Sequence, residues 1–220
     1  MQTNIDLRTS FSNATEAFEY WLEIIRNSGT EFQNTKALFN VGFWLENPLD
    51  NILYHRERPW NQEYADAEWK WYLSGDNRLS TLGEIYGKVP LIWQRMGDQD
   101  GRVNSNYGWQ WNRSNQLDYI VNLLERDPQT RQAAISIYDG KENINYAFDT
   151  PCTYAVQFYI TDNKLNMSVM MRSNDLWFGF CNDQYCFSKL QEKMSKDLDI
   201  EVGTYFHFVN NLHIYNRHLK

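Results

Sequence analysis

A cysteine and an arginine of this chain could together form a reactive thiolate. Cys152 stands between Pro151 and Thr153, at the entrance of a predicted strand. The thiolate is the nucleophilic form of cysteine, and a nearby cation lowers the pKa of the thiol. Arg172 stands at the far end of the next predicted strand, so a hairpin would bring it next to Cys152. On pattern alone, Cys152 could equally be a small buried hydrophobe and Arg172 a surface charge.

Another candidate group stands in the run from Arg172 to Asp183, which reads RSNDLWFGFCND. The pattern predicts that this run leaves a strand, crosses a loop at Gly179 and enters a helix. Asp183 would then lie near the start of that helix, where a carboxylate is favoured by the positive end of the helix dipole. Seen alone, the run favours this structural role over a chemical one.

Alternation of apolar residues predicts the strands that must position these groups. One face of residues 164–172 is apolar and the other is polar, and a turn at 161–163 joins this strand to its predecessor in a hairpin. The apolar face consists of Leu165, Met167, Val169 and Met171. The predicted strands span 133–138, 153–160, 164–172 and 204–215.

Helical spacing dominates the first half of the chain. Ser12 or Asn13 is placed to cap a first helix, whose apolar positions are Ala17, Phe18, Trp21, Leu22 and Ile25. Further predicted helices span about 63–74, ending at Gly75, about 114–126, ending before Asp127, and 182–198. Helices first and strands later predict one α+β domain over residues 1–220, with helices packed on a large mixed sheet.

Composition excludes several classes of protein. Hydrophobic residues make up 42% and charged residues 22% of the 220 residues, which is typical of a globular chain. A net charge of −7 is unfavourable for binding a nucleic acid. The sequence shows neither a membrane-spanning apolar run nor a signal peptide, so we expect a cytoplasmic protein. Three cysteines without a CxxC pair predict free thiols and no metal site.

Six short motifs, in one order, make this sequence similar to the thymidylate synthase family. The resemblance covers about residues 60–218, and the combination is far more specific than any single motif. The motifs are EWKWYLSGD at 68–76, NYGWQW at 106–111, DPQTR at 127–131, Pro151-Cys152 with QFY at 157–159, the run at 172–183, and HIYNRH at 213–218.

The resemblance implies the roles of the reacting groups. Cys152 would add to C6 of a pyrimidine, which makes C5 a carbon nucleophile. C5 would then take a one-carbon unit from 5,10-methylenetetrahydrofolate, the co-substrate that the resemblance implies. Glu68 would organise water and move protons at the base. The implied substrate is a pyrimidine nucleoside monophosphate, and no metal is implied.

The resemblance also implies which residues bind the nucleotide. Arg172 and Ser173 would hold its phosphate, and Arg131 would reach that phosphate from the partner subunit of a homodimer with shared active sites. His213 and Tyr215 would bind the 3′-hydroxyl of the sugar. One face of the predicted mixed sheet would be used for dimerisation.

Three more positions complete the implied site. Tyr107, in the Tyr-Gly motif, would contribute to substrate binding. Asp175 would contact the pterin of the folate, and Trp93 would lie beside the folate.

The base-reading position departs from thymidylate synthases and points to cytosine. Thymidylate synthases carry Asn where this chain has Asp183, and an amide suits the N3–H and O4 of uracil. A carboxyl group can accept from N4 of cytosine and share a proton with N3, so Asp183 predicts cytosine as the base. Phage-type deoxycytidylate hydroxymethylases of the family have Asp here, and resemble this chain in MRSND, in FGF before Asn-Asp, in NSNYGW and in Cys-Thr.

We therefore expect a cytoplasmic deoxycytidylate 5-hydroxymethyltransferase that acts on dCMP, and the sequence leaves open whether it works in a phage-infected host cell or in nucleoside antibiotic synthesis. The alternatives are a methylating enzyme acting on dCMP, CMP or dUMP, and a non-catalytic nucleotide-binding relative.

Further departures concern the phosphate site and the tail. The family has two adjacent arginines in its phosphate loop, and Gln132 replaces the second of them. A further phosphate-binding arginine of the family, expected before residue 60, has no clear match here, and Lys36 is the candidate substitute. The chain ends at Lys220, where relatives continue with a tail that closes over the folate, so we expect the tail of the family to be absent. An open site favours hydration to a hydroxymethyl product.

Overall fold

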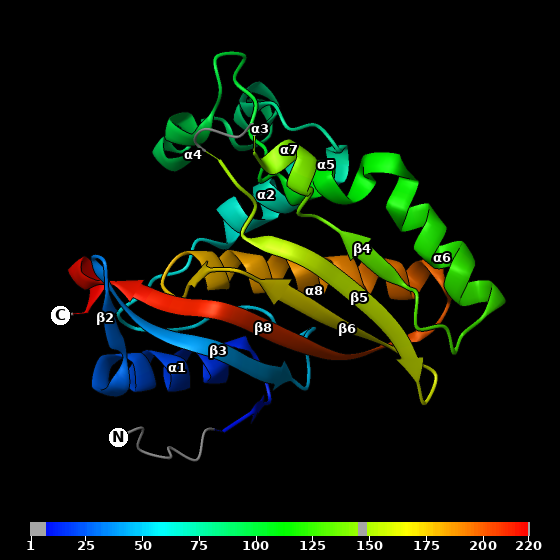
Figure 1. The fold of residues 1–220 in the computed structure, drawn as a ribbon, viewed down its shortest axis with the longest axis horizontal. Coiled ribbons are helices and arrows are strands. Elements are labelled where there is room, and N and C mark those ends of the chain that lie inside the picture. The colour runs from blue at the N-terminus through cyan, green and yellow to red at the C-terminus, as the bar shows by residue number, and fades with distance from the viewer. Residues whose placement is uncertain (1–7, 145–148, 220) are drawn as a thin grey trace.

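One mixed sheet carries the fold (Figure 1). The computed structural model describes residues 8–144 and 149–219. The path through the sheet is β1-β3-β8-β6-β5-β4, with β2 paired to β3 and β7 paired to β8. The strands are β1 Ser10–Phe11, β2 Thr30–Phe32, β3 Thr35–Leu45, β4 Ala134–Ser136, β5 Thr153–Thr161, β6 Lys164–Met171, β7 Asn174–Asp175 and β8 Glu201–Tyr215.

Helices α1 and α8 contact each other and pack on the sheet, α1 on β3 and α8 on β6 and β8. The shorter helices α2 to α5 and α7 gather beyond the end of the sheet where β5 begins (Figure 1). The helices are α1 Ala14–Ser28, α2 Gln62–Ser74, α3 Leu79–Tyr86, α4 Leu91–Met96, α5 Tyr107–Asn112, α6 Gln116–Arg126, α7 Gly140–Asn143 and α8 Gly179–Asp197, with short 3-10 turns at Arg113–Asn115 and Asn216–His218. The predicted α+β fold is confirmed.

The hairpin that positions the candidate thiol forms as predicted. Asp162 and Asn163 both adopt positive φ angles, 51° and 57°, which a tight two-residue hairpin turn requires. The register pairs Thr161 with Lys164 at the turn and Thr153 with Met171 at the open end. The hairpin therefore brings the residues before β5 and after β6 to the same edge.

The predicted helix ends are mostly close to the observed ones. Asn13 caps α1 by accepting from the backbone N–H of Glu16 at 3.0 Å, and α2 ends at Gly75 with a left-handed φ of 64°. The helix predicted from residue 114 starts at Gln116, because Ser114 and Asn115 adopt left-handed backbone angles. Helix α8 begins three residues earlier than predicted, at Gly179.

The sequence pattern did not predict β3, which pairs antiparallel with β8 along most of its length. In the middle of β3, Asn40 has a φ of 58°, and its side chain accepts a hydrogen bond from Asn210. An Asn in this conformation breaks the regular alternation that reveals a strand. The strand-rich second half is thus completed by a strand from the first half.

The two faces of the sheet differ in burial. On the face toward α8, Tyr205, His207 and Val209 are fully buried. The opposite face is only half buried and largely apolar, and we call it the open face; it consists of Trp44, Ala155, Met170, Phe206 and Phe208. Within residues 8–144 and 149–219, no helix combines the length and apolarity needed to cross a bilayer.

Candidate active site

Cys152 and Arg172 lie side by side at the open end of the β5–β6 hairpin. The backbone N–H of Arg172 donates to the carbonyl of Cys152 at 2.8 Å. The guanidinium donates to the carbonyls of Pro151 at 3.0 Å and Thr150 at 2.8 Å, and its Nη2 lies 3.7 Å from the Cys152 Sγ. Two backbone bonds therefore hold the cation against the thiol, as the hairpin prediction requires.

The thiol of Cys152 is nevertheless protonated at neutral pH in the free protein. Burial raises its pKa to about 11, and the carboxyl groups of Asp183 and Asp149 act in the same direction. Arg172 lowers this pKa, as expected, but the other contributions outweigh it. The neutral thiol is thus the favoured form of Cys152 in the absence of substrate.

Asp183 lies in the first turns of α8, within electrostatic reach of this thiol. The Asn174 Nδ2 donates to its Oδ2 at 2.7 Å. Burial raises the pKa of Asp183 well above its ordinary value, the carboxyls of Glu68 and Asp175 raise it further, and the bond from Asn174 opposes them. The protonated form of this carboxyl group is therefore favoured more than in an ordinary aspartate.

Glu68 lies on α2 and is 4% exposed. Its Oε1 accepts from the hydroxyls of Tyr64 at 3.1 Å and Tyr72 at 3.2 Å, whereas its Oε2 is buried with no hydrogen-bond partner. Burial raises its pKa to about 7 despite these two bonds. A carboxyl group with this pKa can both give and take a proton near neutral pH.

Trp93, on α4, reaches Glu68 through one intermediate. Its indole Nε1 donates to the hydroxyl of Tyr64 at 2.6 Å, and that hydroxyl donates to Glu68. The indole also packs edge-on against Trp71 at 5.4 Å. The indole N–H of Trp93 therefore orients the Tyr64 hydroxyl that donates to Glu68.

Tyr107, at the start of α5, is 4% exposed. Burial raises the pKa of its phenol, and the charges of Asp183 and Cys152 raise it further, so the hydroxyl is neutral and lies within electrostatic reach of both groups. Its ring packs against Tyr72 at 5.8 Å and Phe187 at 5.2 Å.

Strands β7 and β8 place Asp175 beside His213 in their register. The Asp175 Oδ1 accepts from the backbone N–H of Trp177 at 3.0 Å. Burial raises the pKa of this carboxyl, and His213 opposes the rise. The neighbouring Phe178 is 45% exposed. A carboxyl group near an exposed ring can hold a flat heterocycle that carries N–H donors. Tyr215 contacts the His213 ring edge-on at 5.4 Å.

The structure does not bring every candidate into this cluster. Ser173 follows Arg172 directly and is partly exposed. Arg131 is exposed before β4, and its carbonyl accepts from Gln157 at 3.2 Å. Gln157 lies five residues along β5 from Cys152, which at about 3.3 Å per residue is roughly 17 Å. Arg131 thus lies away from the thiol of its own chain.

Three side chains of the cluster had no predicted role. Tyr64 and Tyr72 flank Glu68 at four residues on either side, a spacing that puts all three on one face of α2 and could have revealed them. Asn174 stands next to Asp175 in the motif, but its bond to Asp183 spans nine residues and only the fold creates it.

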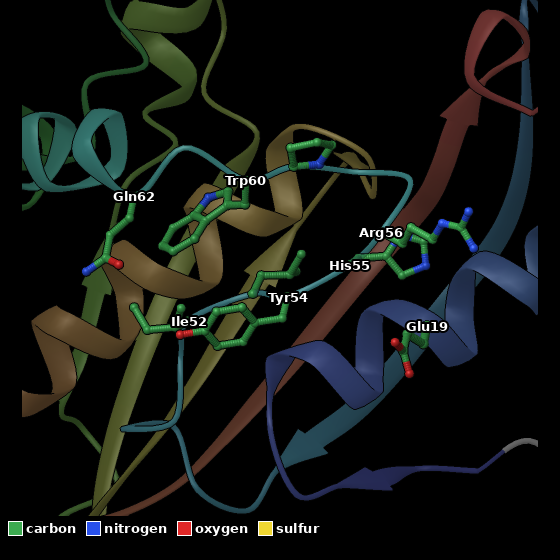
Figure 2. A pocket seen from close by; sticks show the side chains of 9 residues that line it. Glu19, Ile52, Tyr54, His55, Arg56, Trp60 and Gln62 are labelled. Carbon is green, nitrogen blue, oxygen red and sulfur yellow. The ribbon is translucent and has the colours of Figure 1, made fainter.

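A separate hollow of about 500 Å³ lies between α1 and the segment 52–62. Figure 2 shows Trp60 and Gln62 at one end of it and Glu19 of α1 at the other. Trp60, which lines this hollow, donates from its Nε1 to Asn182 at 2.8 Å, next to Asp183 in the chain. In the described part of the chain, no three His, Cys, Asp or Glu side chains gather as a metal site would require.

Comparison with known proteins gives consistent matches. A family profile described as thymidylate synthase matches residues 33–220. The deoxycytidylate 5-hydroxymethyltransferase of Enterobacteria phage T4 is 35% identical over 173 residues, covering 72% of this chain and 69% of that protein. The thymidylate synthase of Bacillus licheniformis is 27% identical over 195 residues, covering 84% and 68%. The structure of thymidylate synthase A from Bacillus subtilis superposes with a TM-score of 0.79 over 93% of this chain and 81% of that chain, at 22% identity, which shows a shared fold.

Proposed function

Because this chain belongs to the thymidylate synthase family, whose members transfer one-carbon groups to pyrimidine nucleotides, we propose that it is a deoxycytidylate 5-hydroxymethyltransferase. The observation that carries the proposal is the carboxyl group of Asp183. It lies within electrostatic reach of Cys152, it accepts a hydrogen bond from Asn174, and its pKa is raised. The similarity to the phage T4 protein of that activity supports the same substrate.

A protonated carboxyl group at residue 183 matches cytosine. Its hydroxyl would donate to N3, and its carbonyl oxygen would accept from the amino group at C4. Uracil offers the reverse pattern, with a donor at N3 and an acceptor at position 4, so it would leave two mismatched polar groups in a buried site. The raised pKa of Asp183 supports a proton at this position before the substrate arrives.

The proposed reaction begins when the Cys152 sulfur forms a bond to C6. The thiol proton must leave, and Arg172, 3.7 Å from the sulfur, stabilises the resulting thiolate. Hydrogen bonding from Asp183 to N3 draws electrons from the ring and makes C6 more electrophilic. C5 becomes a carbon nucleophile as a result.

The bound folate supplies the one-carbon unit at the oxidation level of formaldehyde. C5 would bond to that carbon as one of its two bonds to a folate nitrogen breaks, and C5 would then lose its own proton as the second carbon–nitrogen bond breaks and tetrahydrofolate leaves. A water oxygen would then bond to the same carbon, and the sulfur–C6 bond would break. The sum is dCMP, methylenetetrahydrofolate and water giving 5-hydroxymethyl-dCMP and tetrahydrofolate, with no oxidant or reductant. The free Oε2 and the pKa of Glu68, about 7, suit it to move these protons.

The remaining roles are proposals of the same kind. Arg172 and Ser173 would hold the phosphate, His213 and Tyr215 the sugar, and Tyr107 would line the base pocket. Asp175 would contact the pterin of the folate, and Trp93 would lie beside the folate. Arg131 would complete the phosphate site from the partner subunit of a homodimer, which its distance from its own thiol supports.

Incubation with C5-tritiated dCMP, and separately with C5-tritiated dUMP, tests the function in the presence of methylenetetrahydrofolate. Tritium release from dCMP with a product heavier by CH₂O, abolished in Cys152→Ala, is the expected result. Release from dUMP with a methylated product would replace the proposal by thymidylate synthesis. Release from neither nucleotide, with normal nucleotide binding, would mark the chain as a binding protein.

A further inference from the structure

Behind Asp183 runs a line of buried hydrogen bonds that the proposed reaction does not use. The Asn174 Nδ2 lies 2.7 Å from the Asp183 Oδ2, and the Asn174 Oδ1 lies 3.0 Å from the His207 Nε2. The His207 Nδ1 lies 2.8 Å from the hydroxyl of Tyr205. The side chains of Asn174, His207 and Tyr205 are 2% or less exposed, so water does not compete for these bonds. We call these three residues the relay.

If Asp183 accepts the hydrogen bond from Asn174, the donor and acceptor of every other hydrogen bond in the relay are fixed. Since the Asn174 amide nitrogen donates to the carboxyl, its oxygen must accept, so the His207 Nε2 must carry the hydrogen. The His207 Nδ1 then accepts from the hydroxyl of Tyr205. Burial keeps His207 neutral by lowering its pKa to about 3, so its ring offers one donor and one acceptor. Every donor in the line therefore points toward Asp183.

Gly179 makes room for the bond that links the relay to the carboxyl. A Cβ at this position would lie 2.8 Å from the Asn174 Nδ2 and 3.3 Å from the Asp183 Oδ2. Gly179 has no positive φ, so its backbone conformation does not demand glycine. The space above Gly179 is instead filled by the polar contact between Asn174 and Asp183.

We propose that Asn174, backed by His207 and Tyr205, is a positioning residue that makes the Asp183 Oδ2 the acceptor oxygen and leaves Oδ1 to carry the proton toward cytosine. An oxygen that accepts from Asn174 keeps a second lone pair, which suits the amino group at C4 of the base. The other oxygen is then the donor to N3. The relay thus sets which half of the carboxyl is acid and which is acceptor, and this inference rests on the proposed function.

Base preference is the first test, measured as the ratio of kcat/KM for tritium release from dCMP over dUMP. Asn174→Ala removes the donor to Asp183, and we expect the ratio to fall about tenfold or more, as the loss of a hydrogen bond to an ionisable group predicts. The matched control is Asn166→Ala. Asn166 is 6% exposed and its amide bonds Thr161 and Thr204 in another part of the sheet, so its loss should lower stability and leave the ratio unchanged.

Gly179→Ala is the second variant, because it adds only a methyl group against the Asn174–Asp183 bond and removes no polar group. We expect the ratio to fall in the same direction as in Asn174→Ala. A wild-type ratio in both folded variants would overturn the inference while the proposed function stood. No release from dCMP by the wild-type protein would instead overturn the proposed function and, with it, this inference.

The direction of the relay has a readout without substrate. In the ¹⁵N spectrum of the histidine rings, we expect His207 of the wild-type protein in the form with hydrogen on Nε2, and a mixture of both forms in Asn174→Ala. A wild-type ring with hydrogen on Nδ1 would reverse the line of donors and overturn the inference.

Discussion

At the scale of single residues, the cluster around Cys152 combines a nucleophile with several acids whose pKa values are all raised. Burial is the first cause for Glu68, Asp175 and Asp183, and the charge of Glu68 raises the pKa of Asp183 further. Like charges cannot all ionise in a small buried volume, so burial and mutual repulsion both favour the protonated forms of these acids. Such a site is better suited to passing protons than to attracting cations.

Replacing Asp183 by Asn should reverse the base preference. The new side chain cannot share a proton with N3 of cytosine, and its amide can turn to accept from N3–H and donate to O4 of uracil. We expect kcat/KM for dCMP to fall at least about a hundredfold and tritium release from dUMP to rise. Parallel assays with both nucleotides check this, and an unchanged preference for dCMP would remove Asp183 from base recognition.

Replacing Glu68 by Gln should abolish tritium release and stabilise the protein at alkaline pH. The folded pKa of Glu68, about 7, lies above its ordinary value of 4.5, so the folded state binds the extra proton between these values. Wild-type stability therefore falls as pH rises from about 4.5 to 7, and the full loss, on the order of 3 kcal/mol, is present above pH 7. Gln does not titrate.

Urea unfolding at pH 5 and pH 8 measures this difference. Glu68→Gln should be more stable than wild type at pH 8, and the gap should narrow at pH 5. An equal gap at both values would show that Glu68 does not titrate in this range.

The sequence predicted the position of the thiol and its arginine, because a hairpin of known turn and register fixes which residues meet. It could not predict the protonation states, which depend on burial and on groups from separate elements. The link between Asn174 and His207 crosses 33 residues of sequence and has no periodic signature.

At the scale of elements, the close contact between α5 and α2 places Tyr107. A Cβ on Gly108 would lie 2.0 Å from the carbonyl oxygen of Tyr72, which is backbone and cannot rotate away. The absence of a side chain on Gly108 thus lets α5 rest on the last turn of α2, the helix that carries Glu68.

Gly108→Ala should force these helices apart. We expect a loss of about 3 kcal/mol or more in stability, at the upper end for overpacking, together with a clear loss of activity. Gly140→Ala is the control, because nothing lies within 4 Å of the added Cβ. Thermal unfolding of both variants decides the matter, and equal melting temperatures would contradict the contact.

Element prediction succeeded where local signals were strong and failed where pairing was non-local. The capped helices α1 and α2 and the β5–β6 hairpin follow from residues close together in sequence. Strand β3 escaped because Asn40 interrupts its alternation and because its partner β8 lies more than 150 residues further along the chain. Pairing at that range leaves little local trace.

At the scale of the whole molecule, the open face and Arg131 together favour a dimer. The open face presents aromatic side chains, among them Trp44 and Phe206 in contact at 4.6 Å, that remain only half buried. An apolar sheet face of this kind is typical of a protein–protein interface. We propose that two copies pair through it and that each supplies Arg131 to the other.

Mixing two inactive variants tests this sharing. Arg131→Ala lacks the phosphate contact and Cys152→Ala lacks the nucleophile, so each alone should have little activity. After exchange of subunits, half of the dimers are mixed and one of their two sites has both residues, which predicts about one quarter of wild-type activity. No recovery, despite exchange shown by mass spectrometry, would place Arg131 outside the shared site.

The protonated thiol of Cys152 has a consequence for the lifetime of the protein in a cell. Peroxide and electrophilic metabolites attack the thiolate, so a cysteine with a pKa of about 11 is nearly inert to them between turnovers. Cys181 and Cys186 are buried and also have raised pKa values, which protects them in the same way. We therefore expect the sulfur of Cys152 to react slowly with such oxidants in the nucleotide-free protein.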